Sequence, residues 1–454
     1  MKNFYLLICS IVAFSVGAQE YKVGDLWYDV VDGDAKTCMV TYTDDDTYCG
    51  NVVVPESVTI DGEAYTVVAI GSNAFQESEI TSIELPATIV EIGNRAFEYA
   101  YMLTSVSIPD GVKSIPAYCF SECESLTDVH LGAGVTSLGN LSFSECTSLE
   151  SIVLPEGVVS TERRVFRGCT GLKSVEIRGA MKSIANELFN ECSSLSHIVL
   201  PESLESIGYD SFSGCTSLKS IDIPQGVSSI GERAFQYTGL EAVQLPQGIT
   251  MVSEGCFSNC ASLVKVELGP EVGMLSIEAF AWCPSLVEIE LPESLKKIGY
   301  GAFYGCSALT SLSVPSGVEN IEQWTFNNCT ALQSLSLGCG LKSMGIEMFA
   351  DCTSLESLVC EATVPPACDS STFDGIDFGK CVLTVPEESL GAYREAEGWK
   401  NFTYTTSSQE TISSFCNDSG EAEYFGLDGR KVYAPANGQI VIKKSHGKNE
   451  KMLF

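Results

Sequence analysis

The sequence predicts a solenoid, in which one short structural unit is repeated along the chain and stacked on its neighbours. Three observations predict it. A phenylalanine recurs every 22 or 23 residues along most of the 454-residue chain. Further apolar positions keep a fixed distance from each phenylalanine. A short segment of alternating polar and apolar residues, often followed by proline, recurs in the same register.

The recurring phenylalanine defines the repeat. An apolar residue stands eight positions before it, usually an isoleucine five before it, and usually a leucine six after it. One such unit cannot bury its own apolar face, so stacking of the units is needed to form a continuous core. The thirteen positions are Phe75, Phe97, Phe120, Phe143, Phe166, Phe189, Phe212, Phe235, Phe257, Phe280, Phe303, Phe326 and Phe349.

Each repeat is expected to contain one short strand. Nine and eleven residues after the phenylalanine come two apolar residues, such as Val106 and Ile108, usually with one polar residue between them. This period of two is typical of a strand with one buried face. A proline such as Pro109 often follows and ends the strand, because it has no backbone N–H to donate. The segment from Ile230 to Phe235 and its equivalents then turns the chain back.

The unit Ile-Gly-x-x-Ala-Phe-x-x-Cys-x-x-Leu-x-x-(Val/Ile)-x-(Ile/Leu)-Pro resembles the BspA-like, or Treponema-type, leucine-rich repeat. The resemblance covers residues 66–360, with local departures such as Ser78 and Ala100 in place of cysteine and Thr161–Glu162 in place of Ile-Gly. It implies a leucine-rich-repeat solenoid of about 13 repeats of 22–23 residues. Short parallel strands would lie on one face, with turns or short helical pieces on the other. It also implies a surface protein that adheres to host matrix or cell-surface proteins.

The N-terminal residues predict export. Residues 1–18 form a signal peptide, with Lys2, an apolar run from Phe4 to Val16, and a cleavage site after Ala18. The remaining sequence has no apolar run long enough for a transmembrane segment. Residues 19–65 break the repeat and predict a β-rich cap, with strands at 26–30, 38–42 and 50–55. The acidic residues 44–46 are interpreted as a turn; calcium binding is the alternative, although the spacing matches no EF-hand loop.

The C-terminal residues leave the repeat again. Residues 361–405 predict a second cap, with a last strand at 381–386 and an amphipathic helix at 389–399. Residues 406–454 are interpreted as a Ser/Thr-rich linker and a short β tail. The tail resembles the C-terminal sorting signal of type IX secretion, although it is short and has Gln439 where an aromatic residue is common. A capping hairpin is the alternative.

The chain has 20 cysteines, and ten of them stand three residues after a phenylalanine. Equivalent residues on stacked repeats point the same way, and parallel Cβ vectors give poor disulfide geometry. We therefore expect buried free thiols. Bridging of Cys38 to Cys49 and pairing among Cys360, Cys368 and Cys381 stay open. We call the ten cysteines that follow a phenylalanine the cysteine ladder; they are Cys123, Cys146, Cys169, Cys192, Cys215, Cys260, Cys283, Cys306, Cys329 and Cys352.

Charge and histidine content exclude several functions. Lys plus Arg number 26 against 59 Asp plus Glu, a net charge of −33, which disfavours nucleic acid and anionic membranes as partners. The three histidines, His130, His197 and His446, are too dispersed to share a metal or a catalytic triad. The sequence has no phosphate-binding or dinucleotide-binding motif. We therefore expect no enzyme, no cofactor and no metal, although a carboxylate pair for glycoside hydrolysis stays open.

The exposed side of the strands is the candidate binding face. Residues eight and ten after each phenylalanine alternate with the buried pair and should face solvent. The face lacks an aromatic platform for sugars. We expect an exported protein, secreted or on the outer-membrane exterior, that mediates protein–protein interaction or adhesion. A carbohydrate-binding component of a nutrient-uptake system and a passive surface spacer are the alternatives. The candidate residues are Asp128, His130, Glu176, Asp222, Lys265, Glu267, Glu288 and Glu290.

Overall fold

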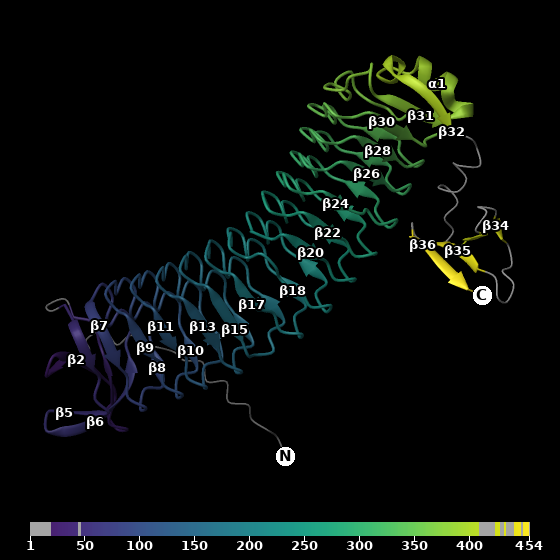
Figure 1. Ribbon diagram of the computed structural model, residues 1–454. Helices are drawn as coiled ribbons and strands as arrows, with labels where there is room; N and C mark the ends of the chain where they lie inside the picture. The colour runs from purple at the N-terminus through teal and green to yellow at the C-terminus, as the bar shows by residue number, and fades with distance from the viewer. Residues whose placement is uncertain are drawn as a thin grey trace. The chain divides into compact units, whose positions relative to one another are not determined.

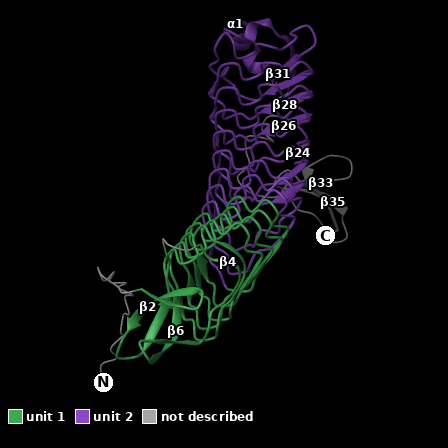
Figure 2. Cartoon of the chain, turned by 90° about the vertical axis from the view of Figure 1, so that its left-hand side faces the viewer, with its two compact units in different colours: residues 1–179 green, residues 180–454 purple. Residues whose placement is uncertain are grey.

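The computed structural model confirms the predicted solenoid, with about 15 turns of short parallel strands. It describes residues 20–43, 47–407, 423–426, 431–432, 440–445 and 448–453. The chain divides into two compact units, residues 1–179 and 180–454 (Figure 2). The predicted signal peptide at 1–18, the acidic turn at 44–46 and most of the predicted linker lie outside the described residues.

A mixed sheet begins unit 1 and corresponds to the predicted N-terminal cap (Figure 1). Its strand order is β1-β2-β3-β6-β5, and β8 (Glu91–Ile92) adds to β6 in parallel, which joins the cap to the repeats. The five strands of the path are β1 (Tyr21–Val23), β2 (Leu26–Asp32), β3 (Thr37–Val40), β5 (Ser57–Ile60) and β6 (Glu63–Ile70).

Two features of this cap differ from the sequence interpretation. Strand β4 (Cys49–Val53), expected in the cap, instead pairs in parallel with β7 (Glu79–Glu84) and begins the repeat sheet. The cap gains the β5–β6 hairpin, whose turn residues Asp61 and Gly62 have φ values of 50° and 86°. Two positive φ values match the twist of a tight hairpin, for which Asp-Gly is a favoured sequence. The Asp61–Gly62 dipeptide was therefore the sequence signal for this hairpin that the sequence interpretation missed.

The strands predicted after the phenylalanines, all except the one after Phe212, line one side of each unit (Figure 1). They pair in parallel, with equivalent residues of successive turns side by side, as for Lys265 and Glu288. Unit 1 contributes β4, β7, β9 (Ser105–Ser107), β11 (Asp128–His130), β13 (Ser151–Leu154) and β15 (Ser174–Ile177). Unit 2 contributes β17 (His197–Val199), β20 (Ala242–Gln244), β22 (Lys265–Glu267), β24 (Glu288–Ile289), β26 (Ser311–Val314), β28 (Ser334–Leu337), β30 (Ser357–Cys360), β31 (Val382–Pro386) and β32 (Thr403–Ser407).

A second, two-residue strand precedes most of the phenylalanines, where the sequence predicted only a turn. Its second residue is usually buried and apolar, as Ile298 is in β25 (Lys297–Ile298). Two residues are too few for an alternating pattern to show. The others are β10 (Ser114–Ile115), β12 (Ser137–Leu138), β14 (Ser160–Thr161), β16 (Ser183–Ile184), β18 (Ser206–Ile207), β19 (Ser229–Ile230), β21 (Met251–Val252), β23 (Met274–Leu275), β27 (Asn320–Ile321) and β29 (Ser343–Met344).

The turn side, which carries the phenylalanines, is held by backbone hydrogen bonds between turns. The N–H groups of Tyr118, Phe120 and Glu122 donate to carbonyls of the next turn at 3.0, 2.8 and 2.7 Å. Tyr118 and Glu122 have φ values of 58° and 59°, in the left-handed region. Residues two before and two after the phenylalanine adopt this conformation in turn after turn. The described repeats thus satisfy their turn-side backbone without a helix.

The phenylalanine rings stack within each unit. Successive centroids are 4.9–6.1 Å apart and the interplanar angles are 2–24°. Tyr48 packs on Phe75 at 4.9 Å, and Phe373 stacks on Phe349 at 5.7 Å. The sequence missed both, because Tyr48 is not a phenylalanine and Phe373 follows Phe349 after 24 residues. The stack therefore continues beyond residue 360, the expected end of the repeats.

The cysteine ladder consists of buried free thiols, as predicted. The thiol of Cys306 donates to the carbonyl of Phe280 in the preceding turn at 3.2 Å, and the equivalent bonds elsewhere measure 3.0–3.2 Å. Thr238 stands in the place of cysteine, and its hydroxyl donates to Phe235 at 2.8 Å. Cys38 and Cys49 are free and lie in different sheets.

The C-terminal end of the solenoid adds two parallel strands, β31 and β32, to β30. Between them lie the short helix α1 (Leu390–Glu395) and the 3₁₀ turns Glu387–Ser389 and Trp399–Asn401. The sequence predicted the helix and β31, but took β31 as the last strand. Trp399 is buried and donates to the carbonyl of Pro366 at 2.9 Å. Cys360, Cys368 and Cys381 are free thiols.

The predicted β tail contains a four-stranded antiparallel sheet in the order β34-β33-β35-β36. Its strands are β33 (Glu423–Gly426), β34 (Lys431–Val432), β35 (Ile440–Ser445) and β36 (Lys448–Leu453).

Candidate binding face

The strand side exposes the predicted residues because alternate side chains of a strand point to opposite faces. In β22, Val266 is buried while Lys265 and Glu267 on either side are exposed. All eight predicted residues are exposed. Asp128, His130 and Glu176 lie on unit 1, and the other five lie on unit 2. Exposure makes these side chains accessible to a partner.

Unit 2 gathers four of the predicted residues into one cluster. The ammonium of Lys265 lies 3.0 Å from a carboxylate oxygen of Glu267 and 3.8 Å from one of Glu288. The hydrogen bond that Lys265 donates to Glu267 raises the pKa of Lys265, with smaller contributions from the charges of Glu288 and Glu290. One cation among three carboxylates leaves a net negative surface. Because all four side chains are solvated, the internal ion pairs hold the cluster only weakly.

Unit 1 places its predicted residues differently. Glu176 pairs with Arg178, whose Nε lies 2.8 Å from the Glu176 carboxylate. The hydrogen bond from Arg178 lowers the pKa of Glu176. Sequence reasoning missed Arg178 because it stands where most repeats have proline. Asp128 and His130 lie on β11, directly beside Ser105 and Ser107 of β9.

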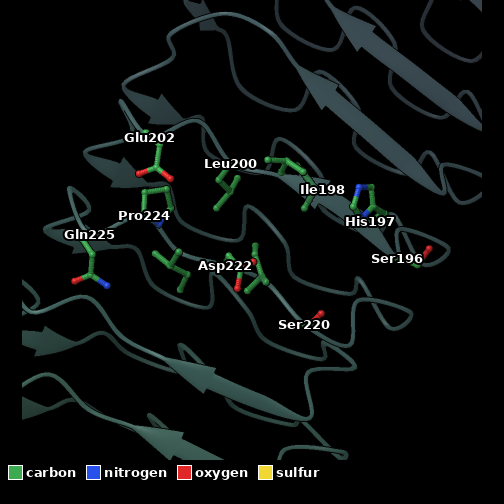
Figure 3. A pocket seen from close by; sticks show the side chains of 12 residues that line it. Ser196, His197, Ile198, Leu200, Glu202, Ser220, Asp222, Pro224 and Gln225 are labelled. Carbon is green, nitrogen blue, oxygen red and sulfur yellow. The ribbon is translucent and has the colours of Figure 1, made fainter.

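A hollow of about 460 Å³ interrupts the strand side of unit 2 (Figure 3). It lies between residues 196–202, which include β17, and residues 220–225, which form no strand. Leu200, Ile221 and Ile223 are buried apolar residues along it. His197 and Asp222 are exposed beside them. The sequence predicted Asp222 and noted His197, but the alternating pattern at 219–223 gave no sign that the strand would be missing.

The described residues show neither a metal site nor a membrane helix. No group of three or more His, Cys, Asp or Glu within them could hold a metal ion. None of the helices in the described part of the chain combines the length and the apolar character that a membrane crossing requires. The strand side of unit 2 therefore offers an open, solvated, acidic surface and a hollow lined by both polar and apolar residues.

Comparison with known proteins identifies the repeats. The family model described as "BspA type Leucine rich repeat region" matches six copies over residues 68–196, 182–286 and 273–378. This is a repeat family, and no enzyme family matches. No curated protein shows significant similarity to the chain.

Solved structures share the fold. A leucine-rich repeat protein from Bacteroides ovatus is 25% identical and covers 85% of this chain and 99% of its own, with a TM-score of 0.67. A leucine rich cell surface protein from Faecalibacterium prausnitzii is 23% identical, with coverages of 80% and 99% and a TM-score of 0.50.

Proposed function

Because the chain belongs to the BspA-type leucine-rich repeat family, we propose that it is an exported protein that binds protein partners at the cell surface through the strand side of its solenoid. The signal peptide expected at residues 1–18 supports export. The F. prausnitzii structure with the same fold is described as a cell surface protein. Extended open sheets are the surfaces that solenoids use for binding.

The observation that carries the proposal is the cluster of Lys265, Glu267, Glu288 and Glu290. Three carboxylates around one ammonium attract a basic patch on a partner. The adjoining sheet is exposed, so a partner could lie across several strands at once. The hollow beside His197 and Asp222 would take a basic side chain of the same partner, because the exposed carboxylates of Glu202 and Asp222 line it. The chemistry supports binding and involves no reaction.

The test uses a panel of immobilised extracellular-matrix proteins as probes. A triple variant, Glu267→Gln, Glu288→Gln and Glu290→Gln, removes the carboxylates and keeps the side-chain size. We expect about tenfold weaker binding, and wild-type binding that weakens as salt rises from about 50 to 500 mM. The matched control changes Glu271, Glu387 and Glu388 to glutamine; these exposed residues lie off the cluster, and the control should bind like the wild type.

Three outcomes would overturn the proposal. Equal losses in the two triple variants would mean that net charge matters and the strand side does not. Binding to a glycan array without binding to any protein would favour carbohydrate capture. If the wild-type protein bound neither a protein of the panel nor a glycan, the result would favour a passive surface spacer.

A further inference from the structure

A cluster of aromatic side chains lies on the turn side of unit 2, away from the strand side. It consists of Trp282, Tyr300, Tyr304 and Trp324, from three successive turns. The Trp282 and Tyr304 rings are 4.8 Å apart at 75°, and Trp324 lies 6.3 Å from Tyr304 and 5.3 Å from Tyr300. Trp282 is 46% exposed and the other three are half-buried. Large rings held together at a surface are typical of recognition sites.

Unit 1 shows what covers an aromatic ring at the equivalent position. The guanidinium of Arg95 lies over the ring of Tyr118, 4.4 Å from its centroid. Arg95 also makes two hydrogen bonds to the carboxylate of Glu98, at 2.9 and 3.0 Å. Arg95 and Tyr118 each stand two residues before a phenylalanine, in successive turns. The chain therefore supplies a cation–π contact from its own sequence here.

The same register in unit 2 lacks the cation. Trp324 takes the place of Tyr118, and Gly301 takes the place of Arg95. A Cβ atom on Gly301 would meet only the side chains of Glu278, at 3.5 Å, and Tyr304, at 3.6 Å, which are ordinary van der Waals distances, so a side chain can begin at this position without a clash. Glu278 is exposed, and its charge helps to raise the pKa of Tyr300, after the larger effect of burial. The aromatic rings and the carboxylate of Glu278 are present, but Gly301 supplies no cation to pack on the rings as Arg95 does in unit 1.

We propose that the Trp282–Trp324 cluster binds an arginine side chain of a cationic peptide segment in a partner protein. Guanidinium is planar and weakly hydrated, so it stacks on aromatic rings better than ammonium does. The carboxylate of Glu278 and the net charge of −33 favour a cation and disfavour anionic ligands. The site is separate from the strand side, so it stands or falls independently of the function proposed above.

Tryptophan fluorescence of the full chain provides the assay. Of the four tryptophans, Trp399 is buried, and the ring of Trp27 already has the ammonium of Lys22 5.5 Å from its centroid, so an added peptide should quench mainly Trp282 and Trp324. The probes are tetra-arginine amide, tetra-lysine amide and tetra-citrulline amide, the last being the neutral isostere of the first. We expect saturable quenching by the arginine peptide, weaker quenching by the lysine peptide and none by the citrulline peptide. Trp282→Ala should weaken arginine-peptide binding about tenfold.

Gly301→Arg is the most informative variant, because the new side chain would place the chain's own guanidinium on the aromatic cluster and compete with the peptide. Gly301 has a φ of 56°, and Arg95 and Arg233 adopt 58° and 53° at the same register, so arginine fits this backbone. The variant should reduce arginine-peptide binding at least about tenfold. Gly301→Asn is the matched control, since Asn73 has a φ of 58° at this register. It should keep the binding, and circular dichroism should show both variants folded.

Several results would overturn the proposal. Equal quenching by the arginine and citrulline peptides would exclude recognition of the cation. Equal arginine-peptide affinity in wild type, Trp282→Ala and Gly301→Arg would place the interaction elsewhere on the acidic surface. Quenching by a neutral oligosaccharide such as maltohexaose, with none by the arginine peptide, would assign the cluster to carbohydrate.

Discussion

Replacement of Cys306 should show whether the cysteine ladder acts by hydrogen bonding or by packing alone. Cys306 is fully buried, and its thiol donates to the carbonyl of Phe280 at 3.2 Å. Three substitutions separate the two roles. Cys306→Ala removes both the donor and the sulfur contacts, Cys306→Ser keeps a donor on a smaller side chain, and Cys306→Val has no donor but keeps the apolar contacts and adds one heavy atom.

The expected free-energy costs follow from burial. Removing a donor from a buried carbonyl costs about 1–3 kcal/mol, and losing the contacts of one heavy atom costs about 1 kcal/mol more. We therefore expect unfolding free energy to fall by about 3 kcal/mol in Cys306→Ala, at least about 2 kcal/mol in Cys306→Val and about 1 kcal/mol in Cys306→Ser. Serine should be tolerated because Thr238 and Ser78 place hydroxyls at this register, and each finds an acceptor in the phenylalanine carbonyl of its own turn, three residues earlier.

Hydrogen exchange in the turns around Cys306 is the appropriate measurement, since the stability of a solenoid is the sum of local units and their interfaces. Urea unfolding followed by circular dichroism gives the global value. Cys49→Ala is the control; Cys49 is exposed, so its loss should change stability by less than about 0.5 kcal/mol. If Cys306→Val proved as stable as the wild type while Cys306→Ser did not, the thiol would be a packing group and the reasoning would be refuted.

Two other predictions concern a buried acid and the left-handed backbone. Burial, helped by the charge of Glu293, raises the pKa of Glu361 from 4.5 to about 7. The stability that this group contributes is therefore full below about pH 4.5 and is lost as the pH rises through 7. Glu361→Gln should raise the thermal midpoint at pH 8 but not at pH 4, and equal shifts at the two pH values would contradict this. Tyr237 has a φ of 57° and is 53% exposed. In urea unfolding, Tyr237→Val should lower the unfolding free energy by about 1–2 kcal/mol, because a β-branched residue is strained at this φ, and Tyr237→Gly should leave it almost unchanged. An unchanged unfolding free energy in Tyr237→Val would refute the claim of strain.

The repeat could be predicted because its signal is periodic. Thirteen phenylalanines, with a strand pattern such as Ser105–Val106–Ser107 after them, determine both the solenoid and its exposed side. The elements that were missed carry weak local signals. The two-residue strand Lys297–Ile298 is too short to alternate, and its pairing partners are each 23 residues away. Phe373 falls one residue out of step, although its ring continues the stack.

The candidate sites also divide into features that the repeat pattern predicts and features that depend on three-dimensional packing. Exposure of Glu267 and Glu288 follows from alternation alone, so the sequence predicted it. The hollow beside Asp222 arises because residues 220–223 do not pair as a strand, although their pattern resembles that of neighbouring turns. The aromatic cluster was missed because Trp282, Tyr304 and Trp324 occupy different positions in their repeats. Only the stacking of turns brings them within 4.8–6.3 Å.

The location of the protein on its native cell tests the central claim most directly. Intact cells of the native host would be treated with protease, and the cell and medium fractions would be probed with an antibody against the repeats. The account predicts that the protein is removed from intact cells by the protease or is already present in the medium. Protection until the outer membrane is broken would contradict surface binding and would restrict its partners to the cell envelope.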